Sequence, residues 1–170
     1  RKWLSKPRRK MPDYIIVRPK ADEVTDPDAL DGYAQATYNL QHCYFLVDEA
    51  YQLHKNGQAL PGLVALLTRG RSRKIGVVLC TQRPKWISLF CLTESSKFLV
   101  FYLQLADDRA RIGEVIPYSK ALNPEPYHFY FYDTQAQTGG DLRYFAPLDI
   151  SARNVQDDAD FVDLYGRKIF

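Results

Sequence analysis

Five consecutive apolar residues followed by two carboxylates lie in the first third of the chain, in the order Cys43-Tyr44-Phe45-Leu46-Val47-Asp48-Glu49. A run that is apolar at every position is typical of a strand covered on both faces of a parallel sheet. Ligands of such sheets bind outside the carboxyl ends of the strands, where Asp48 and Glu49 lie. The stretch therefore predicts an α/β fold with a polar site at one edge of its sheet.

Other apolar runs and helix-like stretches extend this pattern outward. Strands are expected at residues 14–17, 75–80 and 98–103. Helices are expected at residues 27–40, 60–67 and 107–115, the first with Asp26 as its N-cap. Alternating strands and helices predict a mainly parallel sheet flanked by helices.

The aromatic segments at residues 127–132 and 142–145 flank the turn Gly139-Gly140. They predict a β-hairpin added to the C-terminal side of the sheet. Stacking of nucleic-acid bases on residues 127–132 is the alternative, and packing of a strand on the core is favoured.

The composition is that of one folded domain. The chain has 170 residues, 46% of them hydrophobic, and a net charge of +3 that does not by itself argue for nucleic acid. Its three cysteines show no metal-site or redox spacing, and Cys43 and Cys80 lie in apolar runs where a buried thiol is expected. These features favour a reducing compartment such as a cytoplasm. The first ten residues hold a basic group that could meet phosphates or form a solvated tail: Arg1, Lys2, Lys6, Arg8, Arg9 and Lys10.

The carboxylates of Asp48 and Glu49 suit the hydrolysis of ATP. One carboxylate holds the Mg²⁺ that bridges the terminal phosphates, and the other orients and deprotonates the attacking water. Asp48 would take the first role and Glu49 the second. A capping pair at a strand–helix junction is the alternative.

The next strand has polar residues after it and basic residues before it. Thr81 and Gln82 follow it, and an amide there can bind the γ-phosphate or the attacking water; a polar turn is the alternative. The basic residues are Arg69, Arg71, Arg73 and Lys74. Because a strand enters a sheet at the edge opposite to its exit, they are expected to lie away from Asp48 and Glu49. If the protein assembles into a ring of subunits, these basic residues would reach a neighbouring subunit or the central channel. A solvated loop is the alternative.

The two stretches together resemble motifs of the FtsK/HerA superfamily of DNA-pumping ATPases. Residues 44–50 are similar to its Walker B motif, and Gly70-Arg71 with Thr81-Gln82-Arg83-Pro84 to its G-R and T-Q-R-P elements. Asp107-Asp108-Arg109 resembles its D-S-R element. The resemblance spans residues 14–116. It is closest to the small genome-packaging ATPases of membrane-containing viruses and to the Zot-like assembly ATPases of filamentous phages.

The resemblance implies a P-loop NTPase fold of the RecA/ASCE type that binds ATP and Mg²⁺. It assigns Asp48 to the Mg²⁺, Thr81 to the nucleotide, Glu49 to catalysis and Gln82 to sensing of the γ-phosphate. Arg71 is the first candidate for an arginine finger inserted into a neighbouring subunit, and Arg109 is the second. Arg73 and Lys74 depart from the small residues usual in the family at these positions, which leaves room for a contact with DNA or with a neighbouring subunit. With Arg69, they are the candidates for contact with DNA.

The phosphate-binding motif G-x-x-x-x-G-K-[ST] does not occur in the sequence. We expect an upstream segment to supply it, with its strand between the runs at 75–80 and 98–103. Residues 1–150 are then part of a P-loop ATPase domain and residues 151–170 a tail. The intact protein is expected to be an ATPase, and this chain alone inactive.

Three functions fit these residues. The first is an ATP-driven translocase for double-stranded DNA that packages a viral genome as a homo-oligomeric ring, in the cytoplasm or at a capsid or membrane vertex of the virion. The second is a Zot-like export ATPase, which predicts a membrane span; no apolar run here reaches the roughly 18 residues required. The third is an inactive binding module. The joint presence of Asp48, Glu49 and Gln82 argues against it.

Overall fold

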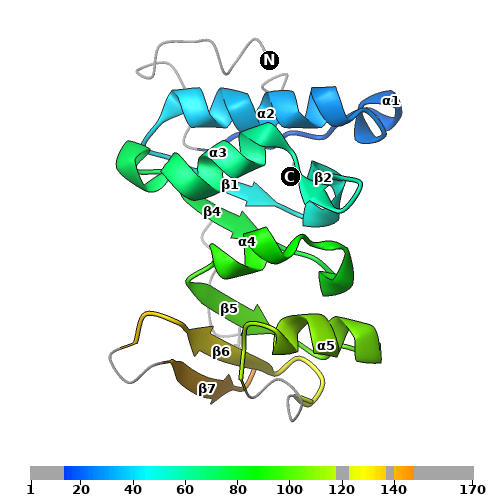
Figure 1. Cartoon of the computed structure of the whole chain (residues 1–170), viewed down its shortest axis with the longest axis vertical. Coiled ribbons are helices and arrows are strands. Elements are labelled where there is room, and N and C mark those ends of the chain that lie inside the picture. Colours follow the sequence, from blue (N-terminus) through cyan, green and yellow to red (C-terminus); the bar gives the residue numbers. More distant parts are fainter. Residues whose placement is uncertain (1–13, 118–122, 137–139, 148–170) are drawn as a thin grey trace, which may run out of the picture. The chain divides into compact units, whose positions relative to one another are not determined.

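The structure is a computed structural model that describes residues 14–117, 123–136 and 140–147 (Figure 1). The basic group at residues 1–10, Gly139 and the tail from 151 lie outside the described residues. The helices are α1 (Ala21–Val24), α2 (Pro27–Leu40), α3 (Pro61–Arg69), α4 (Leu89–Thr93) and α5 (Ala106–Gly113), with short 3₁₀ turns η2 (Ala50–Leu53), η3 (Arg71–Arg73) and η4 (Pro84–Trp86). The strands are β1 (Tyr44–Val47), β2 (His54–Lys55), β3 (Gln58–Ala59), β4 (Gly76–Leu79), β5 (Lys97–Val100), β6 (Phe129–Asp133) and β7 (Asp141–Phe145).

The described residues divide into two compact units. The first comprises the residues up to 45 together with 61–77, and the second comprises residues 46–60 and those from 78 onward. The division falls within β1 and within β4.

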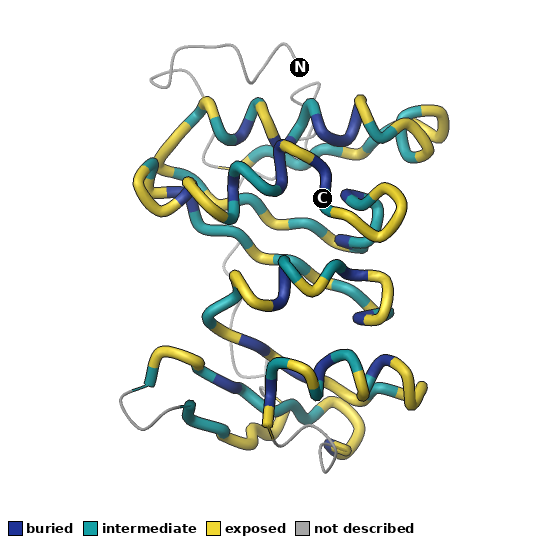
Figure 2. The backbone as a smooth tube through the Cα atoms, in the orientation of Figure 1, coloured by how far each residue is buried: buried dark blue, intermediate teal, exposed yellow. Residues whose placement is uncertain are grey.

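The first unit is built on the pair of helices α2 and α3, which lie side by side (Figure 1). The predicted helix at 27–40 is confirmed, and the carboxylate of Asp26 accepts a hydrogen bond from the backbone N–H of Asp28 at 3.0 Å. Buried and exposed residues alternate along α2 (Figure 2). The buried side packs in a core of Ala34, Leu66 and Ile75.

A buried carboxylate joins the two helices. Asp31 is only 6% exposed, and its two oxygens accept hydrogen bonds from the N–H of Gly62 and from Nε2 of Gln35, each at 2.6 Å. A Cβ atom at Gly62 would lie 2.8 Å from Asp31 Oδ1 and 2.9 Å from Ala34 Cβ. Glycine at this position therefore lets the start of α3 approach α2 closely.

The second unit contains the antiparallel sheet β5-β6-β7. The predicted hairpin is confirmed as β6 and β7, with Tyr130 opposite Tyr144, and β6 also pairs with β5, with Tyr132 opposite Phe98. Tyr132 and Phe98 are both buried and their rings lie 6.4 Å apart. The aromatic segment therefore forms a strand that contributes to the core.

Several expectations are corrected by the structure. Residues 14–17 form no strand, because no described segment pairs with them. β1 is not covered on both faces in the described part of the chain, since Tyr44 is 83% exposed and Leu46 66% exposed. Cys80 is exposed rather than buried. A short hairpin that was not predicted joins β2 and β3, and its turn residues Asn56 and Gly57 have positive φ, 54° and 75°.

Among the described residues, no helix is both long enough and apolar enough to cross a membrane.

Candidate functional site

The strand ends that carry Asp48-Glu49 and Thr81-Gln82 are neighbours in the second unit. Strands β1 and β4 form a two-stranded sheet. The N–H of Cys80 donates to the carbonyl of Val47, and the N–H of Ala50 donates back to the carbonyl of Cys80, both at 2.8 Å. These bonds run in parallel register, so both chain segments leave the sheet at the same edge. The structure thus brings together the acidic pair and the Thr-Gln pair, as predicted.

Glu49 has an unusual backbone conformation. Its φ of 56° and ψ of 57° place its backbone in the left-handed region, which residues other than glycine and asparagine rarely adopt. It stands at the N-cap of η2, yet its side chain makes no capping hydrogen bond. Strained backbone of this kind clusters at functional sites, and the capping role considered for Glu49 finds no support.

The carboxylates of Asp48 and Glu49 are accessible to a ligand. Asp48 is exposed and Glu49 is half-buried. Within the part of the chain that the structure describes, no ion pair joins either carboxylate to a basic residue. Although the Cys80 residue is exposed, partial burial of its thiol, together with the charge of Asp48, raises the pKa of that thiol.

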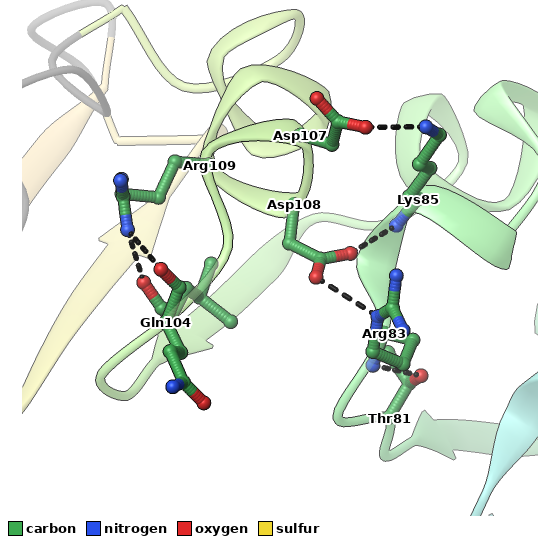
Figure 3. Close-up of polar contacts among 8 residues, drawn as sticks. Thr81, Arg83, Lys85, Gln104, Asp107, Asp108 and Arg109 are labelled. Atoms are coloured by element: carbon green, nitrogen blue, oxygen red, sulfur yellow. Dashed lines mark hydrogen bonds and ion pairs between the residues drawn. The ribbon is translucent and has the colours of Figure 1, made fainter.

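A buried aspartate fixes the segment after Thr81 and Gln82 (Figure 3). The hydroxyl of Thr81 accepts a hydrogen bond from the N–H of Arg83 at 3.0 Å, closing a turn. Asp108, 2% exposed, accepts from Nε of Arg83 at 3.0 Å and from the N–H of Lys85 at 2.9 Å. The guanidinium carbon of Arg83 lies 4.4 Å from the ring centre of Trp86. The sequence contained the signal for this arrangement in the Asp107-Asp108-Arg109 element, but it did not assign Asp108 a role.

The side chain of Arg109 is bound to backbone carbonyls. Its Nη1 donates to the carbonyls of Leu103 at 2.5 Å and Gln104 at 2.9 Å, as Figure 3 shows. Asp107, two residues earlier in the same helix, pairs with Nζ of Lys85. The start of α5 is therefore tied to the segments on either side of it.

The basic residues before β4 belong to the first unit and form a separate group. Arg73 packs on Tyr38, with its guanidinium carbon 4.2 Å from the ring centre and Nη1 3.4 Å from the Tyr38 carbonyl. Arg69, Arg71 and Lys74 are exposed and form no ion pair with the described residues. Arg71 and Lys74 line an open hollow of about 510 Å³ that also borders Tyr44.

A histidine in the second unit has polar partners that sequence reasoning missed. The Nε2 atom of His54 lies 3.3 Å from Ser88 Oγ and 3.6 Å from Cys91 Sγ. These residues are 34 and 37 positions away in the chain, so only the fold brings them together.

The donor set at the sheet edge fits Mg²⁺ bound together with phosphates. Within the described residues, no three His, Cys, Asp or Glu side chains are grouped so as to enclose a metal ion. Magnesium is typically held by one or two carboxylates, with waters and substrate phosphates as its other ligands. The carboxylate of Asp48, which is exposed and forms no ion pair with a described residue, meets this requirement.

Comparison with known proteins identifies relatives among viral packaging enzymes. No family model matches the sequence. A stretch of 71 residues, 42% of this chain, is 38% identical to the DNA packaging ATPase of Enterobacteria phage PRD1. The aligned stretch spans 30% of the length of that protein.

The fold matches solved viral NTPases over most of the chain. The genome packaging NTPase of Sulfolobus turreted icosahedral virus 2, solved with ATP-γ-S, superposes with a TM-score of 0.67 at 22% identity, covering 79% of this chain and 67% of that one. The DNA-packaging ATPase of Sulfolobus turreted icosahedral virus superposes with a TM-score of 0.61 at 21% identity, with the same coverage. Part of the sequence is therefore similar to a viral DNA packaging ATPase, and most of the chain shares the fold of solved viral genome-packaging NTPases.

Proposed function

We propose that the protein containing this chain is an ATP-driven motor that moves double-stranded DNA into a viral capsid. The observation that carries the proposal is the pairing of β1 with β4, which places Asp48-Glu49 beside Thr81-Gln82 at one sheet edge. The PRD1 relative, a DNA packaging ATPase, supports the same function.

Each residue at this edge has a chemical task in the proposed reaction. Mg²⁺, when bound with ATP, neutralises charge on the phosphates, and Asp48 would hold it. Glu49 accepts a proton from the attacking water and orients it toward the γ-phosphate. Thr81 has a hydroxyl proton free to donate to a phosphate, because its oxygen is the acceptor in the bond from Arg83. Gln82, exposed at the same edge, would hydrogen-bond the γ-phosphate through its amide.

Arg71 is the better candidate for an arginine finger that completes a neighbour's site in a homo-oligomeric ring. It is exposed, whereas the guanidinium of Arg109 is held by two hydrogen bonds from its Nη1 to backbone carbonyls. A finger from a neighbour accelerates phosphoryl transfer by roughly 10³- to 10⁵-fold.

Contact with DNA phosphates falls to Arg69 and Lys74 rather than to Arg73. The guanidinium of Arg73 is engaged by Tyr38, and the other two cations are exposed. Cations without a carboxylate partner release counterions from DNA, which makes binding depend on salt.

The experiment that tests this function is hydrolysis of ATP by the whole natural protein, with and without double-stranded DNA, beside its Glu49→Gln variant. We expect DNA to stimulate hydrolysis and the substitution to abolish it while ATP binding persists. A folded, oligomeric protein that does not hydrolyse ATP would refute the motor and leave a binding module.

A further inference from the structure

Three polar side chains meet inside the second unit, away from the residues assigned above. His54 Nδ1 lies 3.1 Å from the carbonyl oxygen of Ala50, and His54 Nε2 lies within 3.6 Å of both Ser88 Oγ and Cys91 Sγ. Ser88 Oγ lies 3.3 Å from Cys91 Sγ, and Cys91 is 1% exposed. The imidazole therefore has a partner on each side.

The partners fix the protonation of the ring. A carbonyl oxygen can only accept, so Nδ1 carries the proton of the neutral ring and donates it to Ala50. Nε2 is then an acceptor for the Ser88 hydroxyl or the Cys91 thiol. Burial lowers the pKa of His54 more than the bond to Ala50 raises it, which favours this neutral form.

A nucleophilic role for Cys91 does not fit the geometry. The thiol is almost fully buried, and burial raises its pKa more than the hydrogen bond from Ser88 lowers it. A reactive cysteine needs an exposed thiolate. The group is a set of hydrogen bonds that joins chain segments.

The joined segments are those that bear the proposed catalytic residues. Ala50 directly follows Glu49, and Ser88 is the N-cap of α4, reached from Gln82 through the turn at Arg83 and η4. The rings of Tyr51 and Trp86 make a second link between these segments, edge to face at 5.3 Å. His54 adds a polar link, because its ring has a hydrogen-bonding partner in each segment.

We propose that His54 is a positioning residue that holds the Asp48-Glu49 loop against the segment following Gln82. The imidazole keeps the carboxylate of Glu49 and the amide of Gln82 at a set separation. This inference rests on the proposed function, because it assumes that Glu49 and Gln82 act on the same phosphate.

Two substitutions test the contact between His54 and Ser88, each by changing one of the two residues. His54→Asn retains a donor near the position of Nδ1 and loses the contact with Ser88, and Ser88→Ala removes the same contact from the other side. In the whole protein we expect each to lower kcat for ATP hydrolysis by about 10- to 100-fold, with KM for ATP changed by less than about threefold, because misplacement of the base affects the transition state more than binding. His54→Gln, which retains an acceptor near the position of Nε2, should recover part of the kcat.

The control variants are Ile112→Val and His128→Asn. The midpoint of urea denaturation is measured for every variant, so that kcat can be compared at equal stability. Ile112 is a buried residue of α5, and His128 stacks on Tyr144 in the β6-β7 hairpin. A native kcat in His54→Asn would overturn the proposal. A fall in kcat no larger than that of an equally destabilised Ile112→Val protein would also overturn it, since the role would then be structural only.

Glu49→Gln, assayed in parallel, distinguishes the two hypotheses. Native hydrolysis in Glu49→Gln would refute the proposed function and this inference with it. Loss of hydrolysis in Glu49→Gln together with native kcat in His54→Asn would refute the inference alone.

Discussion

Asp108 and Arg83 form a hydrogen-bonded ion pair of 3.0 Å between positions 25 residues apart in the chain. The aspartate is almost fully buried, and the arginine is one-third exposed and packs on Trp86. The pair fixes the turn that begins at Thr81, so the shape of the proposed nucleotide site depends on a residue in α5.

Loss of the Asp108 carboxylate should destabilise the protein. Asp108→Ala leaves the N–H of Lys85 and the guanidinium of Arg83 without their acceptor, at a cost of about 1–3 kcal/mol in the free energy of unfolding. Asp108→Asn retains one acceptor and should cost less. Urea denaturation measures both, and Asp107→Ala, which removes an exposed carboxylate from the same helix turn, is the matched control with little expected change. Equal effects of Asp107→Ala and Asp108→Ala would contradict the role of Asp108.

Stability should depend on pH through His54. Its pKa in the folded protein lies below the ordinary value of 6.5, so between these two values the unfolded chain binds the proton more strongly. The free energy of unfolding should therefore fall as pH decreases through that window, and the contribution of His54 should be complete above 6.5. Denaturation of the native protein and His54→Asn between pH 5 and 8 isolates the effect. Parallel pH profiles for the two proteins would show that His54 does not titrate in this way.

The reactivity of Cys80 reports its proximity to Asp48 without any assay of activity. Partial burial of the Cys80 thiol and the negative charge of Asp48 both raise its pKa. Asp48→Asn removes the charge, so alkylation of Cys80 at pH 7.5 should become faster by about two- to threefold. Cys80 is exposed, whereas Cys91 is buried and should react only when the protein unfolds. An unchanged rate would contradict the placement of Asp48 beside the end of β4.

Substitutions among the basic residues before β4 should divide into two classes. Arg69→Gln and Lys74→Gln should each weaken binding of double-stranded DNA irrespective of its sequence and lower the salt slope by about 1. Arg73→Gln should instead lower the free energy of unfolding by about 0.5–1 kcal/mol, since it removes the contact with the Tyr38 ring. Fluorescence anisotropy of labelled DNA over a range of salt concentrations checks the first class. The same slope in all three variants would refute the division.

Local sequence patterns predicted those parts of the fold that local forces determine. The helix at 27–40 begins where Asp26 caps it, and the aromatic hairpin forms where its pattern placed it. The acidic pair and the Thr-Gln pair could be predicted to share a sheet edge because parallel strands end on the same side.

Features that depend on distant partners could not be predicted in this way. Residues 14–17 have strand-forming side chains but no described strand to pair with, and a strand exists only with a partner. Asp31, Asp108 and His54 are polar residues whose roles come from contacts 23 to 37 positions away, with Gly62, Lys85 and Cys91 among the partners. Nothing in the neighbouring sequence of each residue specifies such a contact.

The left-handed backbone of Glu49 means that folding and chemistry favour different residues at one position. Glycine adopts that conformation without the cost of roughly 1–2 kcal/mol that a side chain incurs there, so Glu49→Gly would relieve strain in the loop while removing the carboxylate. A search for stabilising substitutions in this protein would therefore select against its proposed activity at the residue that activity most requires.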